Sequence, residues 1–261
     1  MINDSQLETP FASGTAKADN RKVIEIKSLQ KSFGKQTVLS DVSLELFKEE
    51  NLVVLGKSGS GKSVLIKCIV GLLFPDTGEI NVLGKSVLSL NPNELNELRK
   101  KIGFLFQGSA LYDSMTVKQN LEFPLKRIFK KLSQQETDDK VNEALENVGL
   151  IEALHKMPSQ LSGGMRKRIG LARTIIVDPQ IMLYDEPTTG LDPITSNEIS
   201  QLINDVQKKY HTSSIIITHD LPCARITANR VLMLKDGEVY ANGTLKELEN
   251  SSDEWIKSFF K

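Results

Sequence analysis

The feature that most constrains this chain is a glycine-rich stretch set between an apolar strand and an apolar helix. Residues 51–55, "NLVVL", form a short continuous apolar run, which is typical of a strand buried in a parallel sheet. The run leads directly into "GKSGSGKS" at 56–63 and then into the apolar segment "VLIKCIVGLL". Similar apolar runs end in polar residues at "QIMLYDEP" and "SSIIITHD". The sequence therefore predicts an α/β fold with a mainly parallel core sheet.

The glycine-rich stretch matches the pattern G-x-x-x-x-G-K-[ST], in which backbone N–H groups close on phosphate oxygens. The start of the following helix adds the positive end of its dipole. A turn with a chance lysine is the alternative, but the position between a buried strand and a helix argues against it. We expect Lys62 to reach the β- and γ-phosphates of a nucleoside triphosphate, and Ser63 to ligate Mg²⁺. The expected nucleotide-binding residues of this loop are Gly56, Lys57, Ser58, Gly59, Ser60, Gly61, Lys62, Ser63 and Val64.

A second strand supplies two carboxylates for the same chemistry. In "IMLYDEP", Asp185 ends an apolar run, where its carboxylate can hold Mg²⁺ through water. Glu186 follows directly and is placed to polarise an attacking water as a general base. An Asp-Glu pair after a strand is a weak signal alone, because many strand ends simply meet solvent. Together with the phosphate loop, the pair predicts a catalytic Mg²⁺ site.

A second glycine-rich helix start lies about 100 residues downstream, in "LSGGM" at 161–165. A helix N-terminus with two glycines can cap the exposed face of a γ-phosphate. Ser162 would donate its hydroxyl, and Gly163 and Gly164 would donate their backbone N–H groups. A second copy docked head to tail could supply these groups to the first copy's nucleotide. A flexible turn before a helix is the alternative for these five residues.

Taken together, these motifs resemble those of the ATP-binding cassette (ABC) transporter ATPases, and the resemblance extends from about residue 22 to 260. "LSGGM" looks like the ABC signature, which in that family caps the nucleotide of the opposite subunit. Met165 stands where the usual signature has glutamine, which leaves the orientation of this loop open. The resemblance implies ATP as the nucleotide, Mg²⁺ as the metal and a homodimer as the working unit.

The resemblance also assigns roles to residues outside these motifs. Gln107 in "FLFQGS" matches the glutamine that senses Mg²⁺ and the γ-phosphate, and Asp192 in "TTGLDP" matches the loop at the dimer interface. His219 in "ITHD" matches the switch histidine that contacts the γ-phosphate. Phe33 falls where the family stacks an aromatic ring on adenine. The expected catalytic residues are Glu186, His219, Lys62 and Gln107, and the expected metal ligands are Ser63, Gln107 and Asp185.

The rest of the chain suggests an organisation around this core. Residues 1–21 are polar and predict a loose arm before a nucleotide-binding domain over 22–261. "RKVIEIKSL" and "VLSDVSLEL" alternate as half-buried strands do, which predicts an antiparallel β subdomain near the N-terminus. Residues from about 91 to 178 have mainly helical patterns and predict an inserted helical subdomain that carries the signature. Within it, "TVKQ" and "SQQE" fit capping boxes and predict helix starts at Thr116 and Ser133. "VLMLKDGEVYANG" predicts a hairpin with Asp-Gly at its turn. Residues 244–261 predict a short helical tail, able to dock on the same subunit or on its neighbour.

The amino-acid composition limits the partners and the membrane association that the chain can have. Lys+Arg and Asp+Glu both number 33, and this balance argues against a protein that coats nucleic acid, so we expect no nucleic-acid partner. The arginine-lysine run at 166–168 reads as a solvated helix face. Cys68 and Cys223 form no metal-type spacing and are expected to be reduced thiols. No apolar stretch approaches the length of a membrane span, so work at a membrane would need a separate permease.

The segment "FQGSALYDSMTVKQNLEFPL" is similar to the Mla-type cassettes within this family, as are Met165 of the signature and Tyr184 of "LYDEP". Such cassettes serve a lipid-handling permease and a mammalian-cell-entry (MCE) domain protein. The resemblance implies phospholipid trafficking between bacterial membranes, a multi-span permease contacted around Gln107 to Leu125, and a peripheral place on the cytoplasmic face of the inner membrane. A cassette for another small solute, a soluble ABC ATPase of DNA repair or the ribosome, and a plain phosphate-loop kinase are the alternatives.

Overall fold

The structure is a computed structural model that describes residues 21–129 and 131–260. Its strands, in chain order, are β1 (Lys22–Phe33), β2 (Gln36–Phe47), β3 (Asn51–Leu55), β4 (Thr77–Val82), β5 (Lys85–Ser86), β6 (Ile102–Leu105), β7 (Ile181–Asp185), β8 (Ser213–Thr218), β9 (Arg230–Lys235) and β10 (Glu238–Gly243). Its α-helices are α1 (Lys62–Ile69), α2 (Pro92–Arg99), α3 (Val117–Ile128), α4 (Gln134–Glu146), α5 (Gly163–Ile175), α6 (Pro193–Tyr210), α7 (Leu221–Thr227), α8 (Leu245–Glu249) and α9 (Glu254–Phe260). The arm predicted over 1–21 lies outside the described residues, except for Arg21.

The core is a parallel sheet in the order β9-β3-β8-β7-β6. The side chains of β3 alternate between two apolar clusters, with Val54 facing the cluster of α1 and Val53 facing the cluster of α6. Both faces of the sheet are therefore covered, which explains why the central strands are apolar at nearly every position. Because the strands are parallel, their carboxyl ends meet at one edge of the sheet.

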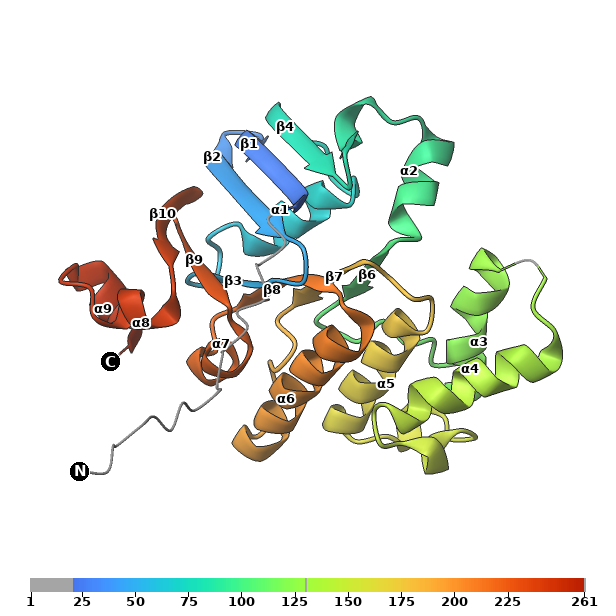
Figure 1. Ribbon diagram of the computed structural model, residues 1–261. Helices are drawn as coiled ribbons and strands as arrows, with labels where there is room; N and C mark the ends of the chain where they lie inside the picture. Colours follow the sequence, from blue (N-terminus) through green and yellow to red (C-terminus); the bar gives the residue numbers. More distant parts are fainter. Residues whose placement is uncertain (1–20, 130, 261) are drawn as a thin grey trace, which may run out of the picture.

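An antiparallel layer extends this sheet in the order β5-β4-β1-β2, and β10 joins it to the core strands (Figure 1). In β1, Ile24 and Ile26 are buried while the intervening Glu25 is partly exposed, so the alternation in the sequence is confirmed. β4 and β5 have no comparably strong alternation of apolar and polar residues, and the sequence did not predict them. The predicted class, an α/β fold with a mainly parallel core and an antiparallel β subdomain, is confirmed.

The helices α3, α4 and α5 share a separate apolar cluster, and α3 and α4 project on the side of the molecule opposite to α8 and α9 (Figure 1). The predicted starts of α3 and α4 are confirmed, since Thr116 with Gln119 and Ser133 with Glu136 both form reciprocal capping boxes. One part of the region 91–178 differs from the mainly helical expectation. Residues 102–105 form β6, the outermost strand of the core sheet. This strand has only four residues, all apolar or small, so its sequence is too short to show the alternation typical of a strand.

The hairpin and the tail complete the chain. Asp236 and Gly237 both have positive φ, 51° and 81°, as the predicted two-residue turn between β9 and β10 requires. The tail forms α8 and α9, and it docks on its own subunit. The centroid of the Trp255 ring lies 4.7 Å from the centroid of the Tyr240 ring of β10 and 4.8 Å from the centroid of the Phe259 ring.

Both thiols are reduced and buried, and burial raises the pKa of Cys68 and of Cys223 to about 11. At pH 8 only about a thousandth of each thiol would then be thiolate, the reactive form. We expect iodoacetamide to leave both cysteines unmodified in the native protein over an hour and to modify both in urea, as read by intact mass. Rapid labelling of the native protein would contradict the burial of these two thiols.

In the part of the chain that the structure describes, no helix has the length and apolar character to cross a membrane.

Candidate nucleotide-binding site

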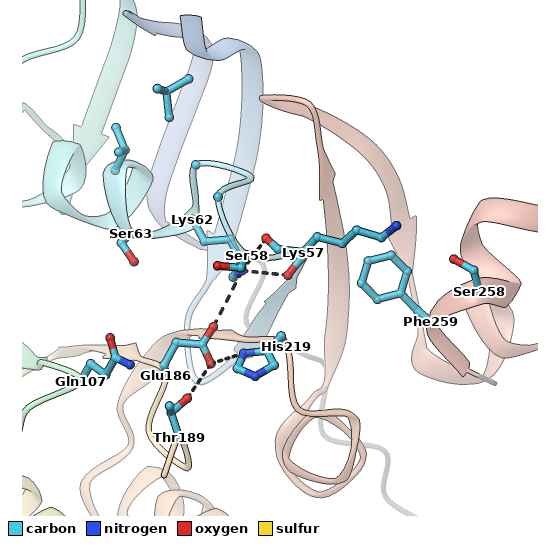
Figure 2. Close-up of a pocket in the computed structure, with 15 residues that line it drawn as sticks. Lys57, Ser58, Lys62, Ser63, Gln107, Glu186, Thr189, His219, Ser258 and Phe259 are labelled. Carbon is cyan, nitrogen blue, oxygen red and sulfur yellow. Dashed lines mark hydrogen bonds and ion pairs between the residues drawn. The ribbon is translucent and has the colours of Figure 1, made fainter. Parts of the chain in front are cut away.

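Four strands end at one pocket on the carboxyl edge of the core sheet. The glycine loop follows β3, Glu186 follows β7 and His219 follows β8, while Gln107 lies two residues beyond β6. This edge is where open parallel sheets bind ligands. The pocket has a volume of about 790 Å³ and is shown in Figure 2. Its lining comprises Val38, Gly56, Lys57, Ser58, Gly59, Gly61, Lys62, Ser63, Val64, Gln107, Glu186, Thr189, His219, Ser258 and Phe259.

The glycine loop adopts a shape that larger residues would disturb. A Cβ added at Gly56 would lie 2.6 Å from the Ser60 Oγ and 2.7 Å from a backbone carbonyl. Gly61 has φ 98°, and a Cβ there would lie 2.7 Å from Leu39 and from the Val38 carbonyl. Within the described residues, the buried Ser60 hydroxyl has no hydrogen-bond partner. A tight backbone loop with an unsatisfied buried hydroxyl fits a site built to receive phosphate oxygens.

The Lys62 ammonium lies at the floor of this loop, where its side chain is 6% exposed. Its Nζ donates to the Gly56 carbonyl at 2.7 Å and to the Lys57 carbonyl at 3.1 Å. Burial lowers the pKa of Lys62, and the nearby carboxylates of Glu186 and Asp185 oppose that shift. The ammonium is therefore held inside the loop by groups of partial or full negative charge, which compensate its burial.

The Glu186 carboxylate lies between the Lys62 ammonium and the His219 ring (Figure 2). Its oxygens are 2.8 Å from His219 Nδ1 and 3.8 Å from Lys62 Nζ, and the Thr189 hydroxyl donates to it at 3.1 Å. The residue has φ 51°, an uncommon conformation for a residue with a side chain. Such strain is often found at functional sites, where the surroundings impose it.

The three residues predicted to ligate a metal lie at or next to the same pocket. The Ser63 hydroxyl donates to the Asp185 carboxylate at 2.8 Å, and the Asp185 residue is 7% exposed. Gln107 lines the pocket beside Ser63. A hydroxyl, a carboxylate and an amide oxygen are the hard ligands that Mg²⁺ takes, together with water and nucleotide phosphates. The residues present therefore fit Mg²⁺, which would neutralise phosphate charge when bound.

Seven predicted residues are not part of the lining of this pocket. Two of them adjoin it, since Ser60 belongs to the glycine loop and Asp185 accepts from Ser63, and the other five lie elsewhere. Phe33 is 47% exposed at the end of β1, where the Lys31 ammonium lies 5.4 Å from its ring centroid. Asp192 caps α6, and hydrogen bonds from Thr195 lower its pKa. At the start of α5, Ser162 caps the helix by accepting from the Met165 N–H at 3.2 Å. Ser162 and the adjacent Gly163 are exposed, and Gly164 is partly exposed. A single chain thus presents the second glycine-rich helix start to solvent.

The structure adds residues that sequence reasoning missed. Thr189 reaches Glu186 from the turn after β7, and Phe259 brings the C-terminal tail to the pocket. Lys167 is 5% exposed, although its basic run was interpreted as a solvated face. Lys167 lies four residues after Gly163, and both are therefore on one side of α5.

Comparisons with known proteins agree with this geometry. The ABC transporter family matches residues 39–189. The Mycobacterium leprae protein named "Probable ribonucleotide transport ATP-binding protein mkl" is 41% identical over 236 residues, which make up 90% of this chain and 68% of that protein. The methionine import ATP-binding protein MetN of Brucella abortus is 37% identical over 87% of this chain and 61% of its own length. The chain thus spans about two thirds of the length of these relatives.

Solved cassettes share the fold. A dimeric ATP-binding cassette, MJ0796, in a post-hydrolysis state bound to ADP and Pi, superposes with a TM-score of 0.78 at 32% identity, over 85% of this chain and 98% of that one. The protein cbiO1 from Clostridium perfringens, part of the ABC transporter complex cbiONQ, gives a TM-score of 0.81 at 28% identity, over 92% of this chain and 95% of that one. With the phosphate loop, carboxylates and histidine at one sheet edge, these matches show that the chain belongs to the ABC transporter family, as a cassette that binds and hydrolyses ATP with Mg²⁺.

Proposed function

We propose that this cassette drives a bacterial phospholipid transporter, working as a head-to-tail homodimer on a separate permease at the cytoplasmic face of the inner membrane. The observation that carries the proposal is the segment that leads from the nucleotide pocket into the helices of the subdomain, residues 106–125. This segment resembles the Mla-type cassettes in sequence, and Gln107 near its start lines the pocket. A change at the nucleotide therefore has a direct route to the surface that would meet a permease.

The segment forms a shaped surface. The rings of Tyr112 and Phe123 lie 5.0 Å apart, and Tyr112 is 42% exposed. The fully buried Asn120 holds the turn between them: it accepts from the Tyr112 N–H at 2.8 Å and donates to the Met115 carbonyl at 3.0 Å. A groove of about 400 Å³ lies alongside, lined by Ser114, Met115, Gln119, Glu122, Phe123 and Lys126. An aromatic-edged groove on a rigid turn suits a short helix from a partner.

The site residues support an ATP-driven closing step. We assign Glu186 as the general base, with the His219 ring and the Thr189 hydroxyl fixing its carboxylate. Lys62 would hold the phosphates, while Ser63, Asp185 and Gln107 would hold Mg²⁺, which polarises the transferred phosphoryl group. Phe33 would stack on adenine. Ser162, Gly163 and Gly164 would cap the γ-phosphate bound by the second copy, with Asp192 at the interface. Closure and reopening of such a dimer would rock the permease.

The names of two relatives suggest other transported substrates. The mkl protein is named for ribonucleotide transport and MetN for methionine import. The ATP-binding residues would be the same for any of these loads, so only the permease and its associated proteins distinguish them.

The test is a pull-down of the tagged full chain from detergent-solubilised membranes of its source, with mass spectrometry of proteins and lipids. We expect a multi-span permease, an MCE-domain protein and phospholipid. A permease recovered with a solute-binding protein would leave the ATPase in place and refute the lipid load. Recovery of DNA or ribosomes without any membrane protein would refute the transport role.

A further inference from the structure

A buried ammonium lies on the side of α5 that faces the chain's own nucleotide pocket. The Lys167 Nζ donates to the Gln107 carbonyl at 2.5 Å and to the Glu186 carbonyl at 3.3 Å. The side chain is 5% exposed. Both partners are main-chain carbonyls, and the carboxylates of Asp185 and Glu186 attract the ammonium from a longer range. Its charge is used to hold the backbone of two loops.

The two loops need such support. Glu186 has φ 51°, and the two residues that follow Gly108, Ser109 and Ala110, have φ 62° and 48°. Residues with side chains adopt these conformations only where the surroundings impose them. A charged donor makes stronger hydrogen bonds to carbonyls than a neutral one does. The Lys167 contacts therefore restrain the backbone of both Gln107 and Glu186 at the point where their side chains enter the pocket.

The same side of α5 is packed closely against its neighbours. A Cβ added at Gly170 would lie 3.0 Å from Ser109, and one added at Gly103 of β6 would lie 2.6 Å from Thr174 of α5. Residues 163, 167, 170 and 174 follow helical spacing, so they form one face of this helix. The exposed helix start, the Lys167 contacts and the tight contact with Ser109 therefore lie along a single rigid element.

We propose that Lys167 is a positioning residue for ATP hydrolysis. It sets the main chain of Gln107 and Glu186 in the pocket of its own subunit, and it ties both to the helix start that would contact the nucleotide of the second copy. The inference rests on the proposed roles of Gln107 and Glu186. Packing alone would not explain a buried charge whose contacts are two carbonyls of one active site.

The test compares Lys167→Met, which keeps an unbranched side chain one atom shorter but loses the donors, with Lys167→Arg, which keeps donors. Arg168→Met is the matched control, because Arg168 is adjacent on α5 yet contacts Val148 and Glu198 instead of the pocket. For Lys167→Met we expect kcat to fall about tenfold or more, since small misplacement of reacting groups has effects of this size. The Kd for ATP and the KM should stay within about threefold, and Lys167→Arg should recover most of kcat.

Hydrogen exchange supplies a readout independent of turnover. In Lys167→Met, peptides that contain Gln107–Ala110 and Glu186–Gly190 should exchange faster without ATP, whereas in Arg168→Met they should exchange as in the wild type. Unchanged kcat and unchanged exchange in folded Lys167→Met would overturn the proposal, as would an equal loss of kcat in Arg168→Met. If Lys167→Met is insoluble, Lys167→Gln takes its place in the comparison with Lys167→Arg. If the transported substrate is not phospholipid, these outcomes are unaltered. Normal turnover by Glu186→Gln would instead refute the assignment of Glu186 as general base, on which the inference rests.

Discussion

Glu186→Gln is expected to bind ATP normally and to lose turnover by roughly 10²- to 10⁴-fold, the usual contribution of a general base. Glutamine has nearly the same shape and still accepts from His219 and Thr189, which lie 2.8 and 3.1 Å from the carboxylate. It also removes a negative charge 3.8 Å from Lys62, so repulsion of the phosphates should not increase. With ATP present, the variant should accumulate as a closed dimer.

The measurement is steady-state phosphate release by the assembled complex, with ATP affinity and size-exclusion chromatography in parallel. Glu198→Gln is the matched control, since Glu198 is exposed and pairs with Arg168 away from the pocket. We expect this control to hydrolyse ATP at the wild-type rate. Normal hydrolysis by Glu186→Gln would rule out Glu186 as the base.

Ser162→Asp is expected to reduce hydrolysis by about 10²-fold, a typical cost of losing a donor to developing negative charge. Aspartate is as good a helix cap as serine, so α5 should keep its start, where Ser162 accepts from Met165. The added charge would instead repel the γ-phosphate bound by the second copy. Ser162→Asn, which caps equally well without charge, is the control and should lose far less activity.

Mixing Ser162→Asp with Lys62→Ala tests whether the two sites are shared between copies. In a mixed dimer one site carries both changes, while the other has an intact phosphate loop and an intact helix start. Random pairing should then give about a quarter of wild-type activity, because half of the dimers are mixed and each has one working site. If every mixture is as inactive as its parents, the helix start does not act across the dimer.

The local chemistry of this chain was largely predictable because its motifs stand at strand ends. The glycine loop, Glu186 and His219 each follow an apolar run, and parallel strands must bring such ends together. The capping boxes at Thr116 and Ser133 fixed two helix starts for a similar reason, since the pattern and the hydrogen bonds are both local.

Contacts that depend on tertiary packing were not predictable. β6 has only four residues, and its position as the outermost strand of the core sheet comes from pairing with β7, which no local pattern encodes. Lys167 resembled its solvated neighbours in sequence, and only the close approach of α5 to the loop after β6 buries it. Phe259 reaches the pocket from the far end of the chain.

The position of α9 has a genetic consequence. Ser258 and Phe259 line the same pocket as Lys62, although both follow His219, the last motif residue along the chain. A nonsense or frameshift mutation between His219 and α9 would leave every recognisable motif intact and still alter a wall of the nucleotide pocket. Alleles that differ only in the codons for α9 should therefore be treated as different ATPases, even where motif searches score them as identical.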